Sequence, residues 1–501
     1  MRTKSSIYVF IVRLISNIFP SILGIILNNL IILKFGSDIN GITSTIGQIL
    51  NFLTIFEGGF TLATNIALYK PYLDKDTNRI NNILSATRII YIRVGCLITF
   101  IALIISFASP YFIKSDLDKN IIIIIFIIAI TNICIEFLFN MKYSIMFAVS
   151  QKEYINSLVV LIFNIISQAL SIVTILLGGN IISIKLVALI IPLLRMPFII
   201  KLLNKNFPNI NFKSKSPDFS VLHTTKDVLA QRLAGLVFGS TDMVIISIMI
   251  NTMYASVYSV YNMIYSFLKS IIFSMVLAPF NAFGQLYAEG DNIKLADYYK
   301  IYQFISIISI NIFITTANIL VLPFVKLYTK NVIDINYIDY NFALLFSAFC
   351  VLEIISNILG LLVNSSGHFK EMKKMAIISA VINIICSLIL VRPFGIKGVV
   401  FGTIIAYCVL DSFLLFQVHI KMLKKGLFDF LFIIAQNFIL SIIILVYSKK
   451  INLNFNNYFD FILNGIIVSI VVTFITFSIN TAINYKLVYS MLKKIKMGFK
   501  K

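Results

Sequence analysis

The sequence predicts an all-α, polytopic membrane protein with about fourteen transmembrane helices, and two observations support this fold class. The first is composition: hydrophobic residues make up 59% of the chain, whereas soluble globular proteins average about 45–50%, and the mean hydropathy is +0.94. The second is that apolar runs recur along all 501 residues between short charged connectors. A run of about 20 residues crosses the ~30 Å hydrocarbon core as a helix, and a helix pairs its own backbone polar groups there.

The predicted spans are the apolar runs of about 20–30 residues between the charged connectors. Their approximate limits are 7–33, 41–69, 83–113, 120–148, 154–178, 182–203, 226–250, 253–280, 297–327, 338–364, 372–391, 396–420, 427–447 and 459–484. Several of these runs are longer than a helix perpendicular to the bilayer needs, so we expect those helices to tilt or to extend beyond the hydrocarbon.

A polar connector over 204–225, with Pro208 and Pro217, divides the spans into six, six and two. Two even sets of spans joined in this way indicate two pseudo-symmetric six-helix lobes with a site between them. The predicted domains are an N-lobe over 1–203, a cytoplasmic linker over 204–225, a C-lobe over 226–420, and a segment over 421–501 with two extra spans and a basic cytoplasmic tail.

The distribution of Lys and Arg predicts the orientation. With a cytoplasmic N-terminus, about 27 basic residues lie on the cytoplasmic side and about 10 on the other, as the positive-inside rule requires. Both termini are therefore expected in the cytoplasm. Arg2 and Lys4 precede an apolar run that is too long for a signal peptide and lacks a small-residue cleavage site, so we interpret it as a retained first span.

Composition and spacing exclude several function classes. The net charge of +21 lies in the connectors and suits an anionic leaflet rather than nucleic acid, because no long basic surface with interleaved aromatic residues is present. None of the five cysteines forms a C-x-x-C motif, and the three histidines are far apart, so we expect no metal site. No Walker A loop or nucleophile–base arrangement is found, so we expect no enzymatic activity.

Charged and polar side chains inside the spans are the candidate functional residues. Arg13 and Asn17 share a helical face in span 7–33, and Arg232 and Asp242 open the second half similarly. The remaining candidates are Asn51 and Glu57 in span 41–69, Arg93 in span 83–113, Glu136 in span 120–148 and Lys269 in span 253–280. An ionised group at mid-bilayer costs at least ~2.5–3.5 kcal/mol. Several such groups therefore indicate a hydrated cavity or internal ion pairs.

Other polar residues in the spans have a simpler explanation. Stripes of Gly, Ser, Thr and Asn often serve helix packing, because small residues let two backbones approach closely. Arg88, Lys185 and Arg195 are expected to extend their charged ends to the headgroup region.

The segment over 39–72 resembles a known family. It reads INGITSTIGQILNFLTIFEGGFTLATNIALYKPY, with Asn40-Gly41 at its start, Glu57-Gly58-Gly59 in its middle and Tyr69-Lys70-Pro71 at its end. Thr241-Asp242 followed by MVIISIM opens the second half similarly. These motifs, together with the span count, resemble the polysaccharide transporter family. Its members are the Wzx-type flippases of the multidrug/oligosaccharidyl-lipid/polysaccharide (MOP) exporter superfamily.

The resemblance implies a V-shaped protein of the bacterial cytoplasmic membrane, with two lobes around a central cavity. It implies a monomer that moves undecaprenyl-pyrophosphate-linked oligosaccharide repeat units from the cytoplasmic to the outer leaflet. The resemblance is also compatible with a polysaccharide polymerase as a protein partner. The implied headgroup contacts are Arg13, Arg93, Arg232 and Lys269, with Asn17 and Asn51 beside them. Glu57, Glu136 and Asp242 are the implied counter-charges or sites for a coupling H⁺ or Na⁺, and no other cofactor is expected.

Three alternatives stay open at this point. A drug or cation antiporter of the same superfamily predicts that acidic residues dominate the cavity, whereas the intramembrane charges here lean basic. A lipid II flippase also has a cationic cavity and about fourteen spans, so the sequence separates it poorly from the first assignment. A membrane ligase or polymerase of polysaccharides predicts a large extracellular catalytic loop, but the outer connectors here are short.

Overall fold

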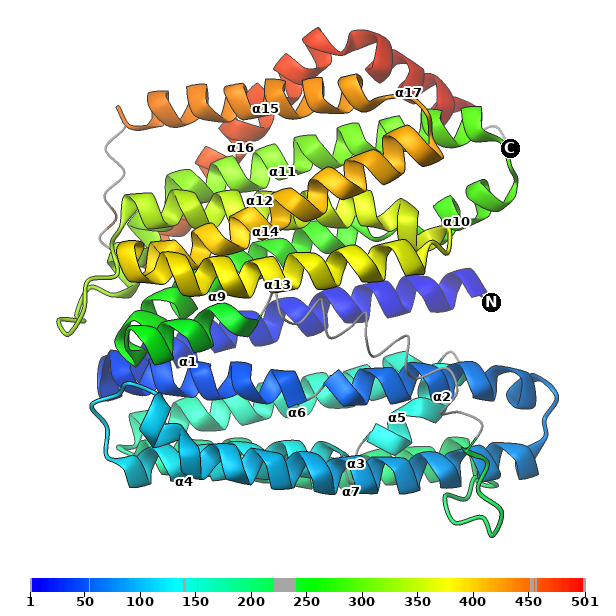
Figure 1. The fold of residues 1–501 in the computed structure, drawn as a ribbon, viewed down its shortest axis with the longest axis vertical. Coiled ribbons are helices and arrows are strands. Elements are labelled where there is room, and N and C mark those ends of the chain that lie inside the picture. Colours follow the sequence, from blue (N-terminus) through cyan, green and yellow to red (C-terminus); the bar gives the residue numbers. More distant parts are fainter. Residues whose placement is uncertain are drawn as a thin grey trace. The chain divides into compact units, whose positions relative to one another are not determined.

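The computed structural model describes the chain from residue 2 to residue 498, with gaps at 54, 138–140, 151, 220–239, 451–454 and 456. All regular secondary structure in these described residues is helical (Figure 1). Eleven of the described helices or helix segments are long and apolar enough to cross a membrane. The chain is thus an all-α, multi-pass membrane protein, as its hydropathy predicts.

The chain folds into two compact units. The first unit comprises residues 1–259, 332–335 and 387–399, and the second comprises residues 260–331, 336–386 and 400–501. The helices α9 (Thr252–Val276), α13 (Phe369–Phe394) and α14 (Ile396–Leu415) contribute residues to both units. Each unit is therefore assembled from more than one stretch of the sequence.

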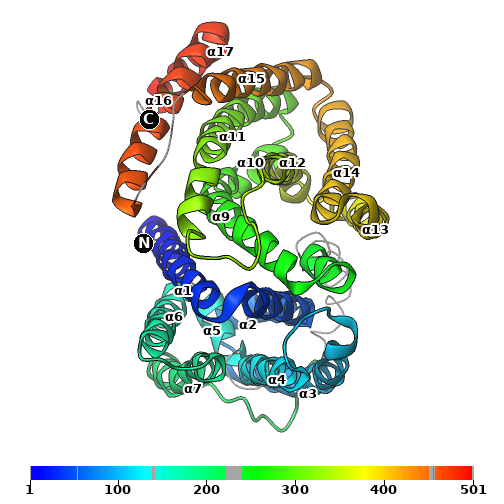
Figure 2. The same cartoon turned by 90° about the vertical axis from the view of Figure 1, so that its left-hand side faces the viewer.

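Besides the helical segment Ser240–Met249, the first two turns of α9, the end of α13 and the start of α14, the first unit contains the helices before residue 207 (Figure 2). They are α1 (Arg2–Leu53), α2 (Ile55–Leu73), α3 (Thr77–Phe112), α4 (Lys119–Ile135), α5 (Met141–Val149), α6 (Glu153–Leu176) and α7 (Ile181–Asn206). α1 turns back on itself at Gly36 (φ 86°, ψ 169°), a conformation that glycine adopts at no steric cost. The predicted spans 7–33 and 41–69 are the arms on either side of this turn.

Aliphatic and aromatic side chains form the core of the first unit. Ile42, Leu84 and Phe126 are fully buried, while Phe100 and Phe198 are more than half exposed. α1 packs on α6, α3 on α4, and α6 on α7. Large apolar side chains on the outer surface are costly in water and favourable in hydrocarbon, so this distribution fits helices that face lipid.

Short polar side chains set the starts of many helices. An Asn or Asp at the N-cap accepts a hydrogen bond from a backbone N–H of the first turn, which otherwise has no partner in the helix. The caps of this kind are Asp76, Asp118, Asn180, Asp291, Asp339 and Asn457. These residues lie in the polar connectors, so the same residues that interrupt the apolar runs also define where the next helix begins.

The predicted linker is tied to the first unit over its described part. Asn211 N–H donates to Asn81 Oδ1 (2.8 Å), and Asp218 N–H donates to the Asn82 carbonyl (3.1 Å). Ser214 N–H donates to Ser85 Oγ (2.5 Å). All three acceptors belong to the first turns of α3, so residues 211–218 follow this helix end rather than extending into solvent.

The second unit contains the remaining helices. Besides parts of α9 and α13 they are α10 (Phe280–Ala288), α11 (Asn292–Tyr328), α12 (Tyr340–Ser365), α14 (Ile396–Leu415), α15 (Leu427–Ser448), α16 (Tyr458–Ile483) and α17 (Tyr485–Gly498). A π-helical segment, Phe416–Met422, continues α14. α11 packs against α12, α15 and α16, so it forms the centre of this unit.

A buried amide network joins α11 to the last two spans. Asn480 and Asn437 exchange two side-chain hydrogen bonds of 2.9 and 3.0 Å, and both residues are at most 3% exposed. Asn311 donates to Ser441 Oγ (3.0 Å) and accepts from Thr476 Oγ1 (3.2 Å). Polar groups in a membrane interior that satisfy one another hold helices together. α15 and α16 are therefore fixed to α11.

We expect Asn480→Leu to lower the free energy of unfolding by about 1–2 kcal/mol, because interhelical hydrogen bonds in membranes contribute up to about that much. The substitution removes the partner of Asn437 and leaves that amide buried. Unfolding in detergent, followed by circular dichroism, measures the loss. Asn464→Leu is the matched control on α16, since Asn464 Nδ2 donates to the Asp460 carbonyl of its own helix. Equal stability of the two variants would contradict the role of the network.

Each of the fourteen predicted spans overlaps a described helix, and three differences are informative. The described part of the span predicted at 120–148 comprises α4, the π-helical residues Glu136 and Phe137, and α5. α10 is a separate short helix beyond the predicted span 253–280. α17 is a helix where the sequence predicted only a basic tail, with Leu487, Val488 and Met491 half-buried and Lys486 and Lys493 exposed. It is too polar and too short to be found by hydropathy.

Candidate functional site

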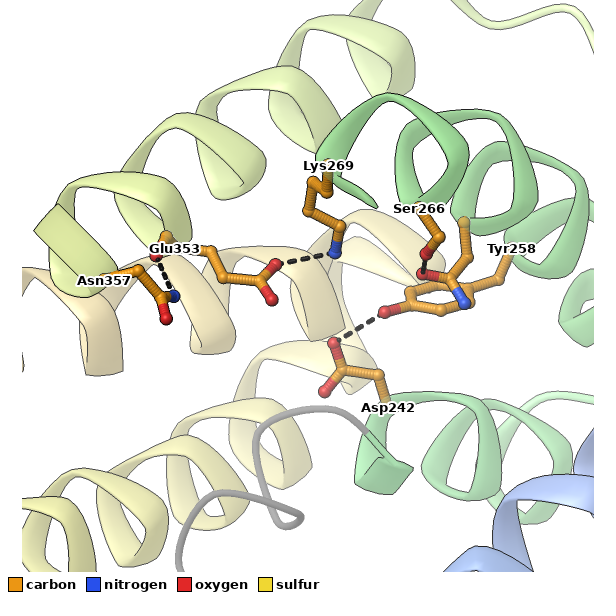
Figure 3. A network of polar contacts seen from close by, with 7 residues as sticks. Asp242, Tyr258, Ser266, Lys269, Glu353 and Asn357 are labelled. Carbon is orange, nitrogen blue, oxygen red and sulfur yellow. Dashed lines mark hydrogen bonds and ion pairs between the residues drawn. The ribbon is translucent and has the colours of Figure 1, made fainter. Parts of the chain in front are cut away.

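A buried ion pair joins α9 and α12 in the second unit. Lys269 Nζ lies 2.6 Å from Glu353 Oε2, and Figure 3 shows the two side chains pointing toward each other. Lys269 is 8% exposed, and its Nζ lies 5.1 Å from the ring centroid of Phe349. The carboxylate and the aromatic face both stabilise the ammonium in a medium where an isolated charge would be costly.

Helical spacing explains how the elements present this pair. α9 carries Tyr258, Asn262, Ser266 and Lys269 at steps of four, four and three, which place them along one face. Ser266 Oγ donates to Asn262 Oδ1 (3.2 Å), so this face is polar over three turns. Of these residues, Lys269 is the one that the sequence predicts as a candidate site residue. Its partner Glu353 lies on a different helix, and no local pattern in the sequence pairs the two.

Asp242 is buried in the first unit. It is 2% exposed, and Tyr258 Oη donates a hydrogen bond of 3.0 Å to its Oδ2 (Figure 3). Asp242 belongs to the helical segment Ser240–Met249, and Tyr258 belongs to α9. A buried carboxylate is costly when ionised, so a bound proton or small cation would lower that cost.

A second ion pair, between a buried arginine and a half-buried glutamate, joins the C-terminal end of α4 to α7 in the first unit. Arg195 Nη2 donates to Glu136 Oε1, and Arg195 is 6% exposed. The prediction that Arg195 extends to the headgroups is wrong, because the carboxylate of Glu136 holds the guanidinium inside the unit. Glu136 is thus the counter-ion of Arg195 in this structure, and the transport role that the sequence predicts for Glu136 stays a prediction.

Two other predicted site residues lie at the surface of the first unit. Arg93 on α3 is exposed. Asn51 on α1 is exposed as well, and its Nδ2 donates to Gln48 Oε1 at 3.3 Å. The backbones of Arg13, Asn17 and Glu57 lie in α1 and α2, but their side chains and the whole of Arg232 lie outside what the structure describes. The roles predicted for these residues stay predictions.

Asp411 on α14 is a buried carboxyl group that the sequence interpretation did not use. It is 5% exposed and accepts a hydrogen bond from Ser356 Oγ on α12. Ser356 lies one turn beyond Glu353, so α12 contacts both Lys269 and Asp411 through neighbouring turns. A single carboxylate in the apolar run YCVLDSFLL was the available signal. Across the described residues, no group of three or more His, Cys, Asp and Glu side chains could hold a metal ion.

Comparisons with known proteins identify the fold. No family model matches the sequence, and no curated protein matches it. The lipid II flippase MurJ, in an inward closed conformation, superposes with a TM-score of 0.71 at 19% identity, over 94% of this chain and 99% of MurJ. An inward-facing multidrug resistance MATE transporter of the MOP superfamily superposes with a TM-score of 0.65 at 15% identity, over 83% of this chain and 99% of its own.

A third solved structure extends the same fold to a different polarity. It is a MOP superfamily transporter from Pyrococcus furiosus, described as having a binding pocket of reverse polarity, with a TM-score of 0.61 and 16% identity over 84% of this chain and 97% of its own. The chain therefore has the fold of MOP superfamily transporters and flippases.

Proposed function

We propose that this chain is a flippase that moves undecaprenyl-pyrophosphate-linked oligosaccharides from the cytoplasmic to the outer leaflet of a bacterial cytoplasmic membrane. The observation that carries the proposal is the extent of the fold match. The MurJ structure covers 94% of this chain, whereas the inward-facing MATE structure covers 83%. Another MATE structure, in the bent conformation, covers 89% of this chain at a TM-score of 0.55. The flippase structure therefore accounts for somewhat more of the chain, and with a higher TM-score, than these MATE structures do.

The chemistry of the buried pair supports an anionic headgroup. A pyrophosphate enters a low-dielectric region only when cations compensate its charge. Lys269 holds a cation in such a region with Glu353 as its counter-ion at 2.6 Å. In the proposed cycle the pyrophosphate replaces Glu353 as the partner of the ammonium, so the lysine stays compensated in the empty and the loaded states. Arg13, Arg93 and Arg232 are proposed as further contacts, since a guanidinium binds phosphate oxygens in pairs.

The driving force in this proposal is an ion gradient. Asp242 is our first candidate for binding the coupling H⁺ or Na⁺, because its carboxyl group is buried and a bound cation would compensate its charge. Glu57 is the second candidate. The protein is proposed to act as a monomer with both termini in the cytoplasm. A polysaccharide polymerase on the outer side of the membrane would then consume the flipped repeat unit.

Reconstitution tests the function. Purified protein in sealed vesicles receives one of three substrates: a lipid-linked pyrophosphoryl oligosaccharide, lipid II or a cationic dye. We expect the oligosaccharide lipid to reach the outer leaflet at least tenfold faster than in empty vesicles, with a dependence on an imposed H⁺ or Na⁺ gradient. Enzymatic labelling of the exposed sugar measures the rate.

Each outcome of that experiment separates the candidates. Faster exposure of lipid II than of the oligosaccharide lipid would assign the chain to the peptidoglycan branch. Uptake of the dye without movement of either lipid would make it a drug antiporter and would refute the proposal. Protein inactivated by heating before reconstitution is the control for leakage of the vesicles.

A further inference from the structure

The first unit contains a polar cavity between α4, α6 and α7 that the proposed headgroup site does not use. Its volume is about 190 Å³. The polar side chains in its wall are Asn132, Asn164, Ser167, Gln168 and Arg195, and Phe163 supplies an aromatic face. One water molecule occupies about 30 Å³ in the liquid, so this cavity has room for more than one water. It is smaller than the ~300 Å³ at which binding sites for drug-sized ligands begin.

Two atoms in this wall are buried without a hydrogen-bond partner in the described protein. They are Nε of Arg195, a donor, and Oε1 of Gln168, an acceptor. Leaving a buried polar atom without a partner costs about 1–3 kcal/mol. The guanidinium cannot turn away, because its Nη2 is held by Glu136. The cavity therefore offers one fixed donor and one acceptor to whatever enters it.

The electrostatics indicate a neutral guest. Glu136 compensates the charge of Arg195, so the cavity has no net charge to attract a pyrophosphate. Donor and acceptor together suit a hydroxyl group, which can accept from Arg195 and donate to Gln168. The ring of Phe163 is fixed against Phe198, with ring centroids 5.3 Å apart, and it offers a flat apolar surface to the C–H face of a ring-shaped polyol.

We propose that this cavity binds one sugar ring of the transported lipid, with Arg195 and Gln168 contacting its hydroxyl groups. The inference rests on the proposed function for the origin of the sugar, and it adds a carbohydrate subsite in the first unit. Arg195 and Gln168 would then select among sugars, whereas Lys269 responds to the pyrophosphate that all such lipids share. Water alone filling the cavity is the competing explanation.

The test compares two lipids that differ only in the sugar: undecaprenyl pyrophosphate and undecaprenyl-pyrophosphoryl N-acetylglucosamine. Binding to the full-length protein in nanodiscs is measured for the wild type, for Gln168→Leu and for Ser171→Ala. Ser171 lies one turn along α6 and its Oγ donates to the Ser167 carbonyl of its own helix, so Ser171→Ala is the matched control. We expect the wild type and the control to bind the sugar-bearing lipid about tenfold more tightly, and Gln168→Leu to bind both lipids equally.

A second measurement does not depend on the lipid. Free N-acetylhexosamines and hexoses, tested singly, should raise the melting temperature of the wild type but not that of Gln168→Leu. Suppose that neither lipid binds, but a free sugar raises the melting temperature of the wild type and not that of Gln168→Leu. The proposed flippase function then fails and the carbohydrate subsite stands. If the wild type binds both lipids equally and no free sugar stabilises it more than Gln168→Leu, the cavity holds only water and the subsite is refuted.

Discussion

Glu353→Met should abolish transport and lower the free energy of unfolding by about 3–5 kcal/mol, the usual cost of removing one partner from a buried ion pair. The substitution leaves the ammonium of Lys269, which is 8% exposed, without its carboxylate at 2.6 Å. The contact with Phe349 remains, but a cation–π contact contributes only about 2 kcal/mol when desolvated. Thermal unfolding in detergent and the vesicle assay measure the two effects.

The double variant Lys269→Met with Glu353→Met separates a structural role from a functional one. Replacing both members of a buried pair by apolar residues of similar size is often neutral or stabilising, so we expect the double variant to unfold near the wild-type temperature. Transport should stay lost, because no cation remains at this position to meet a pyrophosphate. A double variant that transports at the wild-type rate would show that the pair only stabilises the second unit, and Lys269 would be removed from the proposed site.

The Lys269 pair also shows how far the sequence could predict a site. Lys269 was identified because a lone cation on a polar helical face is conspicuous in an apolar span. Its partner is 84 residues away, and only the packing of α9 on α12 determines which of the acidic residues it meets. Arg195 shows the same limit in the opposite direction. Its position in the sequence suggested a free end near the headgroups, but Glu136, 59 residues earlier, holds it inside.

The fold was easier to predict from the sequence than the site, because hydropathy depends on local composition. Apolar runs and polar connectors are visible in the sequence, and N-caps such as Asp291 and Asp339 mark where helices begin. Asp411 was missed because it interrupts an apolar run without forming a stripe. The position of α15 and α16 on α11 depends on amide pairs such as Asn437 with Asn480, and pairing between distant residues of one type leaves no local pattern.

Gly41→Ala should prevent the first unit from folding, although alanine favours a helix over glycine by about 1 kcal/mol. A Cβ at Gly41 would lie 1.7 Å from the backbone oxygen of Thr252 and 2.6 Å from its carbonyl carbon. These are backbone atoms at the start of α9, so no side-chain rotation can relieve the clash, and the two helices would have to separate. Separation would also break the hydrogen bond of 2.7 Å from Asn40 Nδ2 to Ser256 Oγ.

Gly47→Ala on the same arm of α1 is the control, since its Cβ would meet no atom within 4 Å. At this position only the helix preference of alanine acts, so the free energy of unfolding of this variant should rise by about 0.5–1 kcal/mol. The two substitutions are chemically identical and only six residues apart, yet their effects on stability should have opposite signs. Size-exclusion chromatography of the detergent-extracted protein, followed by a thermal melt, compares them. A monodisperse Gly41→Ala variant with an unchanged melting temperature would refute the close approach of α1 and α9, and with it the packing of the first unit around the turn at Gly36.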